Sequence, residues 1–120
     1  MPAPQITDAE WEVMKAVWEE SPVPIGEILK RVSRNHEWHR NTVQTLITRL
    51  VAKRALKATR KGHRCLYSPL ISKDAGIEGA THSFLERVFG GAINPLVMHF
   101  IETKRISKKE LQALAKLLDD

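Results

Sequence analysis

The sequence predicts a mainly α-helical (α+β) protein with two parts: a winged helix-turn-helix domain over residues 1–71 and a small three-helix dimerisation domain over residues 72–120. Apolar residues recur at helical spacing in six segments, and two strand-like segments flank Gly62 directly after the third. The excess positive charge is confined to the first part. A composition of 42% hydrophobic and 28% charged residues over 120 positions is typical of a soluble globular protein.

The first three helices are predicted from caps and apolar stripes. Thr7 and Glu10 have the spacing of a capping box, which predicts a helix from Asp8 to Glu20. A second short helix and a third from Arg40 to Lys53 follow, and Trp38 precedes the third helix where it can pack on its first apolar residue. The apolar residues that define the stripes are Trp11, Met14, Val17 and Trp18, then Ile25, Ile28, Leu29 and Val32, then Val43, Leu46, Ile47, Leu50 and Val51.

Two short segments after the third helix predict a basic β-hairpin. Leu56 to Arg60 and Arg64 to Pro69 are the strands, separated by Lys61, Gly62 and His63. Three helices followed by a basic hairpin is the order of a winged helix-turn-helix domain.

The second part predicts three helices that lack a core of their own. Ser72 caps the first, Gly90 and Gly91 end it, and Ser107 with Glu110 makes a capping box before the last. Because 49 residues with large apolar faces form only a marginal core, we expect a second copy of the chain to cover them; packing on the first domain is the alternative. The predicted dimer interface comprises Phe84, Leu85, Val88, Leu96, Val97, Phe100, Leu111 and Leu114.

The distribution of charge predicts double-stranded DNA as a partner. Between residues 31 and 64 ten Lys or Arg stand against one acid, whereas residues 72–120 carry seven of each sign. A basic segment of this kind is typical of a surface that contacts phosphates. A solvated basic face without a partner is the alternative.

The third helix supplies the candidate base-reading residues. With its apolar stripe turned inward, a continuous strip of small polar side chains faces outward, and amides and hydroxyls of this kind can bond base edges in the major groove. The predicted readers are Asn41, Thr42, Gln44 and Thr45. The predicted phosphate and wing contacts are Arg40, Thr48, Arg49, Lys61, His63 and Arg64. Ordinary solvated polar residues are the alternative.

A metal-binding regulator or adaptor, for which DNA is secondary, is the second functional hypothesis. Its ligands would come from His36, His39, His63 and Cys65. Structural zinc needs about four ligands, and nothing in the sequence brings the two pairs together. We therefore expect no metal and no cofactor. No glycine-rich phosphate loop, nucleophile elbow or zinc-protease motif is present, so we expect no enzyme activity.

No apolar stretch approaches the roughly 18 to 20 residues of a membrane helix. The start, Met1 Pro2 Ala3 Pro4 Gln5, lacks the basic and apolar regions of a signal peptide. We expect a cytoplasmic protein without membrane insertion. The single cysteine, Cys65, excludes an internal disulfide.

Four separated blocks resemble the BlaI/MecI family of penicillinase and methicillin-resistance repressors, whose wider group includes the CopY copper-responsive repressors. They are Ala9–Met14 with Val17 and Trp18, Thr42–Leu50, Ser83–Leu85 with Gly90 and Gly91, and Leu96 with Val97. The resemblance runs from about Ile6 to Leu118. It implies a dimeric winged-helix repressor that binds an inverted-repeat operator and controls β-lactam-responsive genes of antibiotic resistance. It also implies release by proteolysis in the dimerisation half, set off by a membrane-embedded zinc metalloprotease sensor.

The chain departs from the family pattern at several positions. His99 and Phe100 stand where the family has its scissile Asn-Phe pair, which makes them the possible cleavage site. His39 and Arg40 replace a Ser-Pro helix start, which predicts a weaker side-chain cap and an added charge. Gln44 stands where a basic residue is usual, and Arg54 where a glycine is frequent, so we expect a different operator sequence. The end, Leu117 Leu118 Asp119 Asp120, lacks the cysteine motifs of CopY, which excludes copper sensing by that route.

Overall fold

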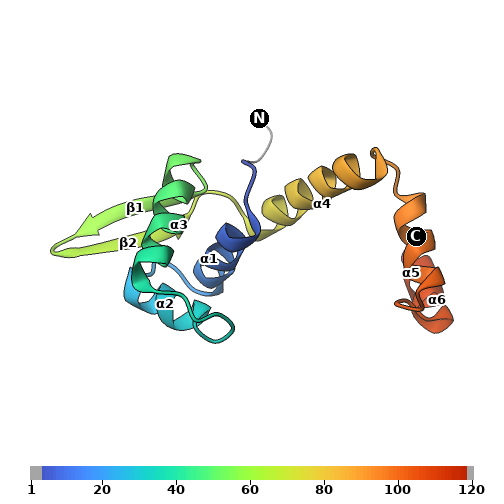
Figure 1. The fold of residues 1–120 in the computed structure, drawn as a ribbon, viewed down its shortest axis with the longest axis horizontal. Helices are drawn as coiled ribbons and strands as arrows, with labels where there is room; N and C mark the ends of the chain where they lie inside the picture. Colours follow the sequence, from blue (N-terminus) through green and yellow to red (C-terminus); the bar gives the residue numbers. More distant parts are fainter. Residues whose placement is uncertain (1–3, 119–120) are drawn as a thin grey trace. The chain divides into compact units, whose positions relative to one another are not determined.

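The computed structural model describes residues 4–118. Met1 to Ala3, part of the start in which no signal peptide is predicted, and Asp119 and Asp120 lie outside the described residues. The predicted order of elements is confirmed (Figure 1). It is α1 (Asp8–Glu19), α2 (Ile25–Val32), α3 (Arg40–Ala52), β1 (Leu56–Lys61), β2 (Arg64–Pro69), α4 (Lys73–Phe89), α5 (Asn94–Glu102) and α6 (Lys108–Lys116).

The chain folds into two compact units, Met1–Ala80 and Thr81–Asp120. The division falls inside α4, whereas the sequence predicted a domain boundary between residues 71 and 72, just before that helix. The first two turns of α4 belong to the N-terminal unit because Gly76 packs closely against the indole of Trp18, whose Nε1 donates a hydrogen bond to the Ile71 carbonyl at 3.0 Å.

The N-terminal unit has one hydrophobic core shared by its helices and the hairpin. The inner stripe of α3 is buried as predicted, and it meets the apolar faces of α1 and α2 and one face of the sheet. The buried hydrophobic residues are Val13, Met14, Ala16, Val17, Val23, Ile28, Val32, Val43, Leu46, Ile47, Leu50, Ala55, Leu56 and Tyr67. This core fixes which side of α3 remains open to solvent.

The two ends of α3 are held by specific hydrogen bonds. At its start, the His39 side chain accepts a hydrogen bond from the Asn41 backbone N–H at 3.1 Å, so the imidazole provides the cap that the sequence predicted to be weakened. At its end, the Ala55 N–H bonds the Leu50 carbonyl at 2.9 Å, around Arg54 with a φ of 63°. This is the Schellman arrangement, with arginine where glycine is the usual residue.

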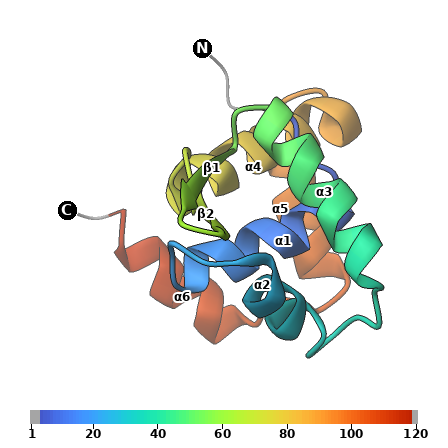
Figure 2. The same cartoon turned by 90° about the vertical axis from the view of Figure 1, so that its left-hand side faces the viewer.

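The hairpin is tighter than the sequence predicted. β1 extends to Lys61, which pairs with Arg64, so the turn consists of Gly62 and His63 alone rather than three residues. Gly62 has a φ of 66°, the left-handed conformation that such two-residue turns require and glycine adopts without strain. Val23 pairs with Tyr67 on the outer edge of β2. Figure 1 shows the hairpin projecting from the base of the helices, and Figure 2 shows the same unit from the side of the hairpin tip.

The C-terminal unit contains the end of α4 with α5 and α6. Gly90 and Gly91, both at positive φ, end α4 as predicted, and the Ser107–Glu110 capping box opens α6. No residue between 81 and 118 is fully buried. Within residues 4–118, no helix is both long enough and apolar enough to cross a membrane.

Candidate nucleic-acid interface

The outward side of α3 is a continuous polar strip, as the sequence predicted. Arg40, Asn41, Thr42, Gln44, Thr45, Thr48 and Arg49 are all exposed. Between them, Val43, Leu46, Ile47 and Leu50 are buried and fix the rotation of the helix about its axis. The strip therefore presents its amides and hydroxyls on the outer side of an α-helix, an element that a DNA major groove can admit.

The four predicted readers differ in how far their polar groups are already used. Within residues 4–118, the side chains of Asn41 and Thr42 make no hydrogen bond, so all their donors and acceptors remain available. The Thr45 hydroxyl donates to the Asn41 carbonyl at 2.9 Å. That leaves Thr45 with acceptor lone pairs and a methyl group for a base edge.

Gln44 is the most constrained of the readers, because its amide is already hydrogen-bonded within α3. Its Nε2 donates to the Thr48 hydroxyl at 3.4 Å. The Gln44 side chain also lies near the Tyr67 phenol of β2. Burial and the neighbouring Cys65 raise the pKa of Tyr67 above its ordinary value, and the nearby Gln44 amide offsets part of this rise.

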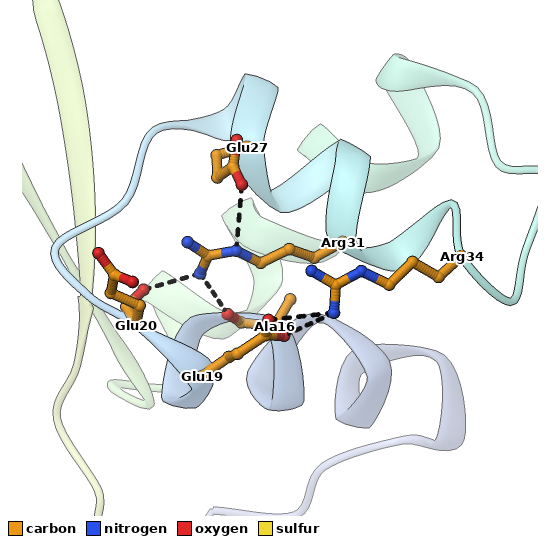
Figure 3. A network of polar contacts seen from close by, with 6 residues as sticks. All are labelled: Ala16, Glu19, Glu20, Glu27, Arg31 and Arg34. Atoms are coloured by element: carbon orange, nitrogen blue, oxygen red, sulfur yellow. Dashed lines mark hydrogen bonds and ion pairs between the residues drawn. The ribbon is translucent and has the colours of Figure 1, made fainter.

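Three of the ten basic residues between positions 31 and 64 are already paired with groups of the N-terminal unit itself. The Arg31 guanidinium donates to the carbonyls of Ala16 and Glu20 at 2.8 Å each and pairs with Glu27, so it closes the end of α1 (Figure 3). Arg34 pairs with Glu19 at 3.0 Å (Figure 3). The count of basic residues in the sequence therefore overestimates the charge available to a ligand.

Lys53 is the third of these basic residues, and it lies against the most deeply buried carboxylate. Its Nζ is 2.5 Å from Glu10 Oε1 and donates to the Gln5 carbonyl at 2.8 Å, while the Glu10 side chain is only 1% exposed. Burial by itself raises the pKa of Glu10, but hydrogen bonds from Lys53 and from the Thr7 backbone outweigh it and lower that pKa. The pair ties the start of α1 to the end of α3.

The other seven basic residues remain exposed, and no described carboxylate lies within 4 Å of any of them. They are Arg40, Arg49, Arg54, Lys57, Arg60, Lys61 and Arg64. The sequence had not indicated Arg54, Lys57 or Arg60 as contacts. Lys57 and Arg60 could not be assigned to a face of the hairpin without its pairing register. His63, selected at the wing, is exposed in the turn.

The histidine and cysteine residues of the metal hypothesis do not converge. His36 Nε2 lies 3.1 Å from Glu12 and its ring stacks on Trp38 at 4.7 Å, while His39 caps α3. Within residues 4–118 no three His, Cys, Asp or Glu side chains group so that they could hold a metal ion. The metal-binding alternative therefore finds no support.

The residues predicted for the dimer interface lie between positions 81 and 118, where no residue is fully buried. Phe84, Val88, Phe100, Leu111 and Leu114 are exposed, and Leu85, Leu96 and Val97 are half-buried. The His99–Phe100 bond lies inside α5, in regular helical backbone.

Comparison with known proteins decides the family. Residues 6–120 match the profile of the family described as "Penicillinase repressor". The chain belongs to the penicillinase repressor family. This is a family of transcriptional repressors and not of enzymes, in agreement with the expectation from the sequence. The chain is 38% identical over 117 residues to a protein named "Penicillinase repressor" from Bacillus licheniformis, covering 98% of this chain and 91% of that one. It is 28% identical over 115 residues to "Methicillin resistance regulatory protein MecI" of Mammaliicoccus sciuri, covering 96% of this chain and 94% of that one.

A solved structure supports the N-terminal fold. The solution structure of the Bacillus licheniformis BlaI monomeric form in complex with the blaP half-operator is 38% identical, with a TM-score of 0.54, over 61% of this chain and 89% of that one. The N-terminal unit of this penicillinase repressor family member therefore has the fold of a protein solved on operator DNA.

Proposed function

We propose that this chain is a cytoplasmic transcriptional repressor that binds an inverted-repeat operator as a homodimer. The observation that carries the proposal is the polar strip of α3, which is bordered by exposed arginines without acidic partners in a chain of the penicillinase repressor family. A strip of this kind fits the division of labour at protein–DNA interfaces, in which base contacts specify and phosphate contacts position.

Base reading is assigned to the four residues predicted from the sequence, in an order that their hydrogen bonds support. Asn41 and Thr42 have all their polar groups available and carry most of the discrimination. Thr45 contributes its methyl group and acceptor lone pairs. Gln44 contributes less freely, because its Nε2 already donates to the Thr48 hydroxyl.

Phosphate binding is assigned to the basic side chains that flank the strip and to the tip of the hairpin. Arg40 stands at the start of α3 and Arg49 in its last turn. At the wing tip, His63 lies in the turn between the paired Lys61 and Arg64, where it can meet the neighbouring backbone or minor groove. Thr48 donates its hydroxyl proton to the Gln44 carbonyl, which leaves it a supporting role.

Dimerisation is assigned to the C-terminal unit because nothing within residues 81–118 is buried, although this stretch carries many large apolar side chains. A unit of this size without a core is stable only when another surface covers it. A second copy provides that surface and gives the two-fold symmetry that an inverted repeat matches.

The regulated genes and the release step are inferred from the relatives. Relatives named penicillinase repressor and methicillin resistance regulatory protein suggest that the regulated genes respond to β-lactams. The upstream membrane metalloprotease sensor is inferred from the family resemblance alone. We place the proteolytic release at His99–Phe100. Because proteases cleave extended backbone, α5 must unwind locally before this bond is cut.

Substitutions in α3 test the assignment of roles. Thr45→Ala should lose about 1 to 3 kcal/mol of discrimination at one base pair, and Asn41→Ala at least as much, whereas Arg49→Ala should weaken all duplexes and lower the salt dependence. Titration of operator and random duplexes over a range of salt concentrations measures both quantities. Equal losses on operator and random DNA for Asn41→Ala would remove that residue from the readers.

A further inference from the structure

The two faces of the hairpin differ in their basic residues. In an antiparallel pair, directly opposed residues share a face and alternate residues share a face. Leu56, Ala58 and Arg60 therefore lie on one face with their partners Pro69, Tyr67 and Cys65, and Lys57, Thr59 and Lys61 lie on the other with Ser68, Leu66 and Arg64.

The face of the hairpin that carries Arg60 is the one that packs toward α3. Leu56 and Tyr67 on this face are buried in the core formed with the inner stripe of α3. Tyr67 also lies near the side chain of Gln44, which belongs to the outward strip of α3. The next residue of this face toward the tip, Cys65, is half-buried against the same core, and it is the partner of Arg60 across the sheet.

Arg60 is the only Lys or Arg of the two strands on this face. It lies two residues beyond the Ala58–Tyr67 pair, which is about 7 Å farther along the strand. Its side chain is exposed, and within residues 4–118 no carboxylate pairs with it. Lys57, Lys61 and Arg64 point to the opposite side.

We infer that Arg60 binds the phosphate backbone at the edge of the groove that α3 reads, and that it couples the wing to the reading helix. The inference rests on the proposed function and deepens it by assigning a contact. A helix in a major groove about 12 Å wide has a phosphate strand on each side. The hairpin face beside α3 looks onto one of these strands, and a guanidinium binds phosphate through two parallel hydrogen bonds.

Arg60→Ala and Lys57→Ala form a matched pair, because both residues are exposed basic residues of β1 on opposite faces. On an operator obtained by selection, Arg60→Ala should weaken binding by about tenfold to a hundredfold for a dimer with two copies, and lower the slope of log affinity against log salt by about 2. Lys57→Ala should change affinity by less than about threefold. Arg60→Lys should recover part of the affinity by restoring charge without the paired hydrogen bonds. Unchanged melting temperatures show that the variants remain folded.

The outcomes separate this inference from the proposed function. Loss in Arg60→Ala with Lys57→Ala near wild type supports it. Equal losses in both variants, or loss only in Lys57→Ala, would overturn the assignment of the face. A selected operator that both variants bind like wild type would overturn the contact while the proposed function stands. Wild-type protein that prefers no duplex sequence would overturn the proposed function and this inference with it.

Discussion

The two units of this protein differ in how far their apolar side chains are buried. The N-terminal unit buries fourteen hydrophobic residues in one core, while no residue between 81 and 118 is buried, and Phe84, Val88 and Leu114 are 39%, 56% and 52% exposed. Burial of apolar surface is the main favourable term in folding. The N-terminal unit therefore has its own source of stability, and under the proposed function a second chain covers the apolar surface of the C-terminal unit.

This difference assigns DNA reading to the N-terminal unit and association between chains to the C-terminal unit in the proposed function. The polar strip of α3 is held by a core that needs no partner, so one chain can contact one half-site. In the proposed dimer, two chains joined through the C-terminal unit would contact two half-sites, and linkage of this kind raises affinity by about 10² to 10⁴ without new contacts. Proteolysis in the C-terminal unit would remove this gain and leave the reading surface intact.

The largest expected effect comes from a charge placed in the predicted interface. Phe84→Asp should convert the dimer to monomers and lower operator affinity by about 10² to 10⁴, because the avidity is lost. His82→Asp is the control, since it puts the same charge on the exposed opposite side of α4. Sedimentation and DNA titration measure both. A Phe84→Asp protein that still sediments as a dimer would refute the assignment.

A smaller effect, confined to the N-terminal unit, is expected at Glu10. Because folding lowers the pKa of Glu10 below its ordinary value of 4.5, its stabilisation is complete above that pH and is lost as the pH falls toward the folded pKa. Glu10→Gln should lower the free energy of unfolding by about 1.5 to 3 kcal/mol at pH 7, and the difference from wild type should shrink below about pH 4.5. Denaturant titration at several pH values tests this.

Glu19→Gln is the matched control for Glu10, because its partner Arg34 is a surface residue. Surface pairs contribute about 0 to 1 kcal/mol. If both variants lost the same free energy, the buried Glu10–Lys53 pair would not hold the N-terminal unit together as described.

Gly76 tests how the start of α4 belongs to the N-terminal core. A Cβ at this position would lie 2.7 Å from Trp18 Cη2, so Gly76→Ala should destabilise the protein by about 1 to 3 kcal/mol despite alanine's higher helix propensity. Gly26→Ala in α2 meets no atom within 4 Å and should stabilise by about 0.5 to 1 kcal/mol. Thermal melts of the two variants that shift in the same direction would contradict the packing at Trp18.

The smallest effect is expected at Arg54, where an arginine adopts the left-handed conformation with a φ of 63°. Arg54→Gly should raise the free energy of unfolding by about 1 kcal/mol, because glycine adopts this conformation without strain. Arg54→Ala serves as control and should gain much less. A destabilised glycine variant, seen by denaturant titration, would mean that the Arg54 side chain contributes more than its backbone costs.

Local sequence patterns predicted the elements of this fold well. Capping boxes at Thr7 and Ser107 and the period of Val43, Leu46 and Ile47 specify structure over a few residues, so they can be read without tertiary information. The exposed strip of α3 followed directly from that period.

Features that depend on tertiary contacts were not predictable from local patterns. The count of basic residues included Arg31, Arg34 and Lys53, which contact carbonyl or carboxylate groups of α1 that are distant in the sequence. The division of the chain fell within α4 because Trp18 reaches Gly76. The faces of the hairpin required the register of β1 and β2, which a two-residue turn fixes.

Selection of a randomised duplex pool by the purified full-length protein, at physiological salt with a chelator present, tests the central claim most directly. Sequencing the bound duplexes shows whether one chain or two read them. The account predicts a two-fold symmetric motif with half-sites about one helical turn apart. A pool that stays unenriched, or gains a motif only when zinc is added, would contradict a metal-independent dimeric reader.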